Sequence, residues 1–212
     1  MIDVTHQINS VSRQVGTRTL EAGEGRTVTV SQTYDSPIDD VWDAVTSIER
    51  IPRWFAPITG DLRLGGRYQL EGNAGGTIER CDPPNGFFAT WEYAGATSWI
   101  EVSLTGTPGG GTRFELVHIA QVDDKIWDEF GPGAVGTGWD LGFLGLALYL
   151  TSGVGNPEQD PSWPLSEEGR LFASLSSEGW RAADVAAGAD PDQAAAAAER
   201  VAAFYTAAPP ES

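Results

Sequence analysis

Several residue types that build chemical sites are nearly missing from this chain. Its 212 residues include one cysteine, one methionine and two histidines. A single cysteine excludes a disulfide framework, and one cysteine with two histidines gives too few ligands for a zinc cluster. We therefore expect no metal and no other cofactor.

Positive charge is scarce as well. Thirteen basic residues, of which only Lys125 is a lysine, stand against 30 acidic ones, and the net charge is −17. Such a chain repels phosphate backbones and anionic lipid surfaces, so we expect neither a nucleic-acid nor a membrane partner. The longest apolar stretch, residues 142–150, is far shorter than the ~18 residues that a membrane span needs. No apolar run of a signal peptide is visible near the N-terminus, so we expect a cytoplasmic protein.

Apolar and aromatic residues are plentiful. Hydrophobic residues make up 41% of the chain, with eight Trp, eight Phe and five Tyr, which is enough to build a core and to exclude general disorder. The length suits one domain with an appendage.

The hydrophobic pattern changes its period along the chain. After a predicted strand and helix, closely spaced alternating segments indicate a curved antiparallel sheet. From Gly136 to Ser152 the spacing becomes helical. The predicted strands cover residues 27–34, 62–70, 72–81, 87–93, 99–105 and 112–119.

We divide the chain into four segments. Residues 1–26 form an arm that is a candidate for an added edge strand, and residues 27–152 form the main α+β domain. Residues 153–166 read as a linker, and residues 167–208 as a helical extension docked on the domain.

Three leucines of the long helix lead us to expect that the extension docks on the domain. Leu141, Leu144 and Leu148 form a stripe on the side of the long helix away from the sheet, and an exposed apolar line of this kind needs cover. The expected cover comes from the extension; a second subunit that gives a homodimer is the alternative. The candidate covering residues are Leu165, Leu171, Phe172, Leu175, Trp180, Val201, Phe204 and Tyr205.

The ordered set of local motifs resembles the SRPBCC (START and Bet v-like) superfamily, in the branch of the activator of the heat-shock-protein-90 ATPase. The resemblance implies a helix-grip fold, in which the curved sheet wraps around a long C-terminal helix. It covers about residues 27–152. The motifs are residues 35–44 (DSPIDDVWDA), 54–57 (WFAP), 61–68 (DLRLGGRY), 76–79 (GTIE), 90–92 (TWE), 111–118 (GTRFELVH) and 138–139 (GW).

Helix-grip folds leave space between sheet and helix, so we expect a cavity there that binds a small hydrophobic or aromatic molecule. His118 shares a strand face with Phe114 and Leu116, so it is either a polar group of the cavity or a hydrogen-bonded core histidine. Glu79 lies on a strand whose register the sequence does not fix. The candidate ligand-binding residues are Trp54, Phe55, Tyr68, Trp91, Phe114, His118, Trp139 and Phe143.

Other motifs carry less chemistry. Residues 131–136 satisfy GxGxxG, but the segment before them is a poor strand, so a glycine turn into the long helix fits better than a dinucleotide site. Cys81 reads as an inert, packed thiol. The strand acids Glu92, Glu101 and Glu115 alternate away from the apolar face and should be solvated.

Three functions follow from these observations. Binding without catalysis is the reading we favour. An enzyme of the cyclase, dehydratase or hydrolase kind, which the resemblance allows, would use His118 with a carboxylate or with Tyr68. A protein-interaction or co-chaperone-like module is the third.

Overall fold

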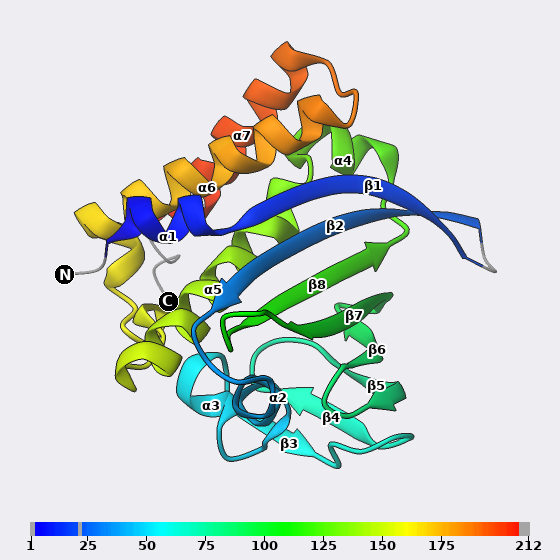
Figure 1. The fold of residues 1–212 in the computed structure, drawn as a ribbon. Helices are drawn as coiled ribbons and strands as arrows, with labels where there is room; N and C mark the ends of the chain where they lie inside the picture. Colours follow the sequence, from blue (N-terminus) through cyan, green and yellow to red (C-terminus); the bar gives the residue numbers. More distant parts are fainter. Residues whose placement is uncertain (1–2, 21–22, 208–212) are drawn as a thin grey trace.

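The chain folds around one antiparallel sheet of eight strands. The computed structural model, which describes residues 3–20 and 23–207, orders the strands β1-β2-β8-β7-β6-β5-β4-β3 (Figure 1). The strands are β1 (Ser12–Leu20), β2 (Gly23–Tyr34), β3 (Ile58–Gly60), β4 (Arg67–Leu70), β5 (Gly75–Asp82), β6 (Gly86–Tyr93), β7 (Ala96–Gly106) and β8 (Thr112–Ala120).

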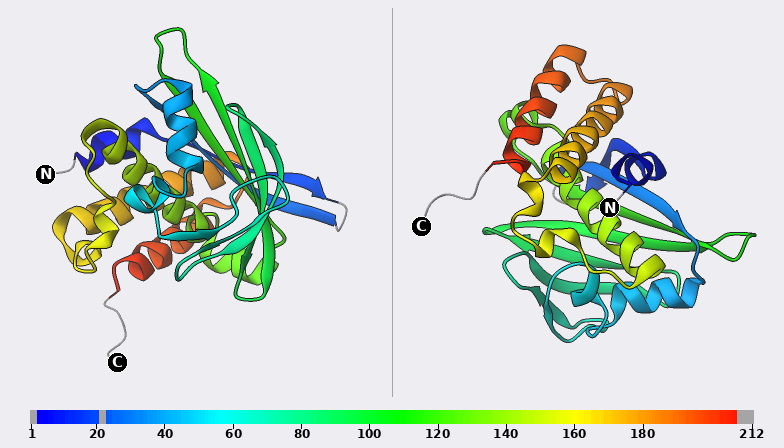
Figure 2. Two further views of the ribbon diagram at one scale, coloured as in Figure 1. Left: turned by 90° about the horizontal axis from the view of Figure 1, so that it is seen from below. Right: turned by 90° about the vertical axis from the view of Figure 1, so that its left-hand side faces the viewer.

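The sheet curves around the long helix α5 (Gly133–Ser152), so the fold is α+β of the helix-grip type, as expected (Figure 2). None of the described helices is long and apolar enough to cross a membrane. The other helices are α1 (Val4–Ser10), α2 (Ile38–Thr46), α3 (Ile51–Trp54), α4 (Asp124–Phe130), α6 (Glu167–Ala186) and α7 (Pro191–Tyr205), with short 3-10 helices η1 (Pro157–Gln159) and η2 (Trp163–Leu165).

Alternation along the strands builds the core. On β8, Phe114, Leu116 and His118 face inward and are buried, as the period of two predicts. Val102 pairs with Leu116, and Ile100 pairs with His118, on neighbouring strands. Side chains of one face are thereby stacked in rows toward α5.

Two glycines of α5 let neighbouring elements come close. A Cβ atom on Gly136 would lie 2.2 Å from the Trp180 ring of α6, and one on Gly145 would lie 2.2 Å from the Trp54 carbonyl oxygen of α3. Real Cβ contacts are longer than this, so both approaches require glycine. The small residues of α5 therefore fix how tightly α3 and α6 pack on it.

The outward face of α5 is covered from both ends of the chain. Leu141 and Leu144 are buried in a cluster with Phe172 of α6 and with Val4 and Ile8 of α1. Helix α1 was not expected, because residues 1–26 were predicted to be an arm with a candidate edge strand. Several candidate covering residues lie elsewhere: Leu165, Leu171 and Phe204 are exposed, and Trp180 belongs to the main core.

A buried ion pair joins the same elements. Arg13 Nε of β1 donates to Asp140 Oδ2 of α5 over 2.9 Å, and Ser176 and Trp180 of α6 donate to the same oxygen. Burial raises the pKa of Asp140, against the opposite effect of Arg13 and the two other donors. The carboxyl group thus connects arm, long helix and extension.

The GxGxxG run is the junction between two helices: residues 131–132 form the turn and residues 133–136 begin α5. Residues 131–136 follow helix α4 rather than a strand, and Gly131 has φ +57°, which favours glycine. No βαβ unit surrounds it, because every strand pair of the described sheet is antiparallel. The run simply leads the chain from α4 into α5.

Candidate functional site

A cavity of about 530 Å³ lies between the sheet, α5 and the α2–α3 segment. Its lining is almost entirely apolar. The lining residues are Trp42, Val45, Thr46, Ile51, Trp54, Phe55, Ile58, Leu62, Arg63, Leu64, Tyr68, Leu70, Ile78, Cys81, Pro83, Phe87, Ala89, Trp91, Ile100, Val102, Phe114, Leu116 and Trp139.

Six of the eight candidate residues line this cavity. They come from α3 and its C-terminal cap, from three strands and from α5, and are Trp54, Phe55, Tyr68, Trp91, Phe114 and Trp139. The expectation that His118 and Phe143 surround the same space is wrong. Phe143 stacks behind Phe114, with ring centroids 4.8 Å apart, and Trp139 stands between His118 and the space.

His118 is a hydrogen-bonded core residue. The indole N–H of Trp139 donates to its Nδ1 over 3.0 Å, so Nδ1 carries no proton. The other nitrogen, Nε2, therefore bears the proton and donates to Ser98 Oγ over 2.9 Å. Burial lowers the pKa of His118 to about 4. Both ring nitrogens are engaged, and the neutral ring orients Trp139.

Four aromatic rings form a continuous surface at one side of the cavity. Trp54 stacks on Phe55, Phe55 stacks on Trp139 with centroids 6.1 Å apart, and Trp91 lies 5.0 Å from Trp139. Offset and tilted pairs of this kind are favourable beyond their buried area. They present flat, rigid faces to whatever fills the space.

Two buried polar groups of the cavity lining bond to backbone carbonyls of the protein. Tyr68 donates its hydroxyl to the Thr90 carbonyl over 2.7 Å, and Trp54 donates its indole N–H to the Ala44 carbonyl over 2.8 Å. Burial, and secondarily the charge of Glu92, raises the pKa of Tyr68 well above its usual value. Tyr68 is thus a poor acid–base group here.

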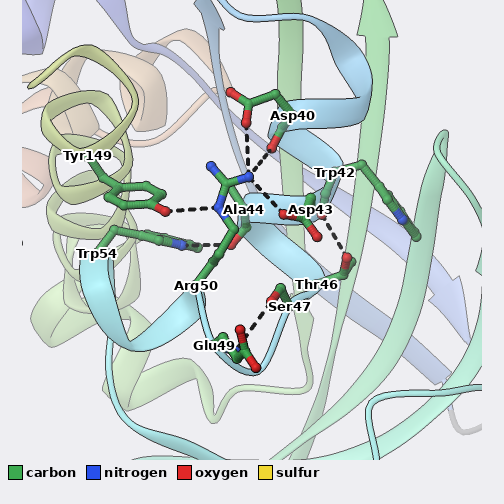
Figure 3. A network of polar contacts seen from close by, with 10 residues as sticks. All are labelled: Asp40, Trp42, Asp43, Ala44, Thr46, Ser47, Glu49, Arg50, Trp54 and Tyr149. Carbon is green, nitrogen blue, oxygen red and sulfur yellow. Dashed lines mark hydrogen bonds and ion pairs between the residues drawn. The ribbon is translucent and has the colours of Figure 1, made fainter. Parts of the chain in front are cut away.

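The α2–α3 side of the cavity is fixed by Arg50 (Figure 3). Its Nη1 donates to Asp40 and Asp43 of α2 over 2.9 Å, and its Nε donates to the Tyr149 hydroxyl of α5 over 2.9 Å. Burial lowers the pKa of Arg50, but these hydrogen bonds outweigh it and the net change is upward. This Arg50 cluster ties α2 and α3 to α5.

Exposed lining residues mark where the cavity opens to solvent. We call this region the mouth; it consists of Arg63, Leu64, Cys81 and Pro83. The interpretation of Cys81 as a packed thiol is wrong, because the residue is exposed. Partial desolvation of the thiol, followed by the charge of the neighbouring Asp82, raises the pKa of Cys81, so little of it is thiolate near neutral pH.

The four glutamates of the strands do not line the cavity. Glu79 is exposed and does not line the cavity, because a bulge between Ile78 and Arg80 turns the strand. Glu92, Glu101 and Glu115 pair with arginines, such as Arg67 with Glu92 over 2.8 Å. Among the described residues, no group of acids, histidines or cysteines is arranged to hold a metal ion.

Several residues that line the cavity were not predicted from the sequence. Trp42 and Val45 share the buried face of α2, and the apolar spacing of that helix indicates such a face without showing that it meets a cavity. Leu62, Arg63 and Leu64 lie in a loop within the double-glycine motif, where no periodicity tells which side chains face inward.

Comparison with known proteins agrees with this architecture. Residues 35–151 match the model of the family described as activator of Hsp90 ATPase homolog 1-like protein. No curated protein matches the chain.

The chain is similar to CalU16 from Micromonospora echinospora at 34% identity. The CalU16 crystal structure superposes with a TM-score of 0.66, over 85% of this chain and 99% of that one. The solution structure of CalU16 gives a TM-score of 0.70, over 84% and 97%.

An HSP90 activator from Plasmodium falciparum, PFC0360w, shares the fold at 18% identity. Its TM-score is 0.51, over 60% of this chain and 96% of that one. The family match over residues 35–151, together with the likeness to CalU16 over 85% of the chain, shows that the chain belongs to the activator of Hsp90 ATPase homolog 1-like family of the SRPBCC superfamily.

Proposed function

We propose that this protein binds a small hydrophobic or aromatic molecule in the cavity between the sheet and α5. The observation that carries the proposal is the cavity itself: about 530 Å³ of space with an apolar and aromatic lining. A volume in this range suits a drug-sized ligand, and burying apolar surface supplies about 25 cal/mol per Å².

The chemistry of the lining favours binding over catalysis. His118 lies behind Trp139 with both nitrogens engaged, and the Tyr68 hydroxyl donates to a backbone carbonyl. The cavity therefore offers flat rings and aliphatic groups rather than a poised proton donor or acceptor.

A neutral aromatic probe, N-phenyl-1-naphthylamine, tests the proposal through its fluorescence and through the melting temperature of the protein. We expect saturable binding to the wild-type chain. Ala89→Leu and Leu116→Trp add volume inside the cavity, and each should weaken binding about tenfold or more.

Val154→Trp is the matched control, because Val154 is exposed and does not line the cavity. It should leave binding unchanged. If the cavity-filling variants, while still folded by circular dichroism, bind the probe as well as the wild type does, the proposal is wrong.

A further inference from the structure

Any charged end of an occupant has to stay at the mouth. Inside the cavity, the Tyr68 hydroxyl and the indole N–H groups of Trp54 and Trp139 already bond to the protein. The indole N–H groups of the other two lining tryptophans, Trp42 and Trp91, are neutral donors that cannot balance a charge. A charged group among the remaining apolar side chains would be unpaired, which costs several kcal/mol. An amphipathic ligand therefore enters with its apolar body inward.

The mouth has one positively charged lining residue, Arg63, which forms an ion pair with Asp61. Arg63 is the one charged side chain among the described lining residues, and no acidic residue lines the cavity. Acids outnumber basic residues 30 to 13 in the chain, so a basic lining group runs against the overall composition. The nearest acids in sequence are Asp61 and Asp82, which flank the mouth.

The terminal nitrogens of Arg63 are available. Its Nε donates to Asp61 over 2.6 Å, while Nη1 and Nη2 form no hydrogen bond within the described residues. A guanidinium presents two such groups side by side, which matches the paired oxygens of a carboxylate, sulfonate or phosphate. Asp61 thus orients one edge and leaves the other for a ligand.

The loop that carries Arg63 is held in place. Gly65 donates its backbone N–H to the Ile78 carbonyl over 2.8 Å, and Ile78 donates back to the Gly66 carbonyl over 3.0 Å. Gly65 has φ +78°, and a Cβ atom on Gly66 would lie 2.0 Å from the Asp61 carbonyl oxygen. The backbone at Arg63 is therefore preorganised beside β5.

We infer that the ligand is an aromatic anion, with its rings in the cavity and its acidic group at the mouth against Arg63. The inference rests on the proposed function and narrows its ligand class. It makes the arginine a determinant of specificity, while the apolar lining supplies most of the affinity.

Two probes that differ only in charge test this inference. 8-Anilinonaphthalene-1-sulfonate has the ring systems of N-phenyl-1-naphthylamine with one sulfonate added. We expect Arg63→Gln to lower the affinity for the sulfonate probe about fivefold. The affinity for the neutral probe should stay within about twofold of its wild-type value. Arg63→Lys should retain most of the affinity for the sulfonate, and Asp61→Asn should increase it.

Arg170→Gln is the control for net charge, since Arg170 is an exposed residue of α6 outside the cavity. It should change neither probe. If Arg63→Gln lowers the affinities for the two probes by the same factor, or changes neither, the inference is wrong and the proposed function stands. Failure of both probes to bind the wild type would overturn the two together.

Discussion

At the scale of single residues, His118 gives the molecule a dependence on pH. Its pKa is lowered from 6.5 to about 4 by burial. Below pH 6.5 the unfolded chain binds a proton that the folded chain refuses, so stability falls with pH down to about 4. Above pH 6.5 the neutral ring carries no such penalty. The full loss is about 3 kcal/mol.

Urea unfolding at several pH values measures this effect. We expect His118→Asn to flatten the decline between pH 6.5 and 4, while Asp140, whose raised pKa acts in the opposite direction, contributes equally to both proteins. A proton NMR titration of the His118 ring gives a second readout. If His118 titrates like an exposed imidazole, our assignment of the strand faces is wrong.

Cys81 offers a direct report on the mouth. It is the single thiol, it is exposed, and its pKa is raised by burial and Asp82. We expect slow modification by a disulfide reagent near neutral pH, with a rate that still climbs above about pH 9. Saturation with the neutral naphthylamine should slow the reaction about fivefold or more by covering the mouth.

Denatured protein controls for the intrinsic reactivity of the thiol. Leu116→Trp, which should bind the probe weakly, controls for effects of the probe that do not depend on its binding in the cavity. Equal rates with and without bound probe would contradict the placement of Cys81 beside the occupied space.

At the scale of elements, the Arg50 cluster holds the α2–α3 segment against α5. Arg50→Gln removes the ion pairs with Asp40 and Asp43 and the hydrogen bond to Tyr149. Because these groups are only partly buried, we expect a loss of about 1–2 kcal/mol in the free energy of unfolding. Tyr149→Phe removes one acceptor and should cost less.

Arg53→Gln is the matched control, since Arg53 is an exposed neighbour in α3. It should leave the unfolding midpoint unchanged. If Arg50→Gln and Arg53→Gln prove equally stable, the cluster contributes nothing measurable.

The sequence predicts helices and strands better than it predicts which buried side chains reach the cavity. Alternation correctly places Phe114, Leu116 and His118 on one face, but a period of two cannot distinguish a residue that touches the cavity from one in the layer behind it. The error at His118 has this origin, and Phe143, on the helix α5, has its counterpart: a helical period gives the face of the helix but not the distance to the cavity. The missed residues of the mouth lie in a loop, where tertiary contacts alone decide orientation.

The helices α1 and α4 were not predicted, although each begins with a capping residue that the sequence shows. Asp3 caps α1 by accepting from the His6 backbone N–H, and Val4 and Ile8 are spaced by four. Asp123 caps α4 in the same way. Each helix has seven residues, too few for a clear period, so the capping aspartates were the better clue.

At the scale of the whole molecule, the division into a domain at residues 27–152 and an extension at residues 167–208 stays a prediction that truncation tests. Ending the chain at Gly153 would uncover Leu141 and Leu144, each worth roughly 1.5–3 kcal/mol of burial. It would also remove the Ser176 and Trp180 donors of the buried Asp140. We expect aggregation or a large drop in melting temperature.

Size-exclusion chromatography and a melting curve of the truncated chain make the measurement. The full chain, measured under the same conditions, is the reference. A monomeric and equally stable product of the larger truncation would contradict the docking of the extension.

The shared cover of α5 has a consequence for synthesis. Synthesis of α5, with its outward leucines, finishes at Ser152. Synthesis of α6, which supplies Phe172, finishes at Ala186, 34 residues later. At about 5–20 residues per second, the ribosome needs about two to seven seconds for that stretch. The long helix is thus made seconds before its α6 cover, and of the residues that bury Leu141 and Leu144, only those of α1 are synthesised earlier.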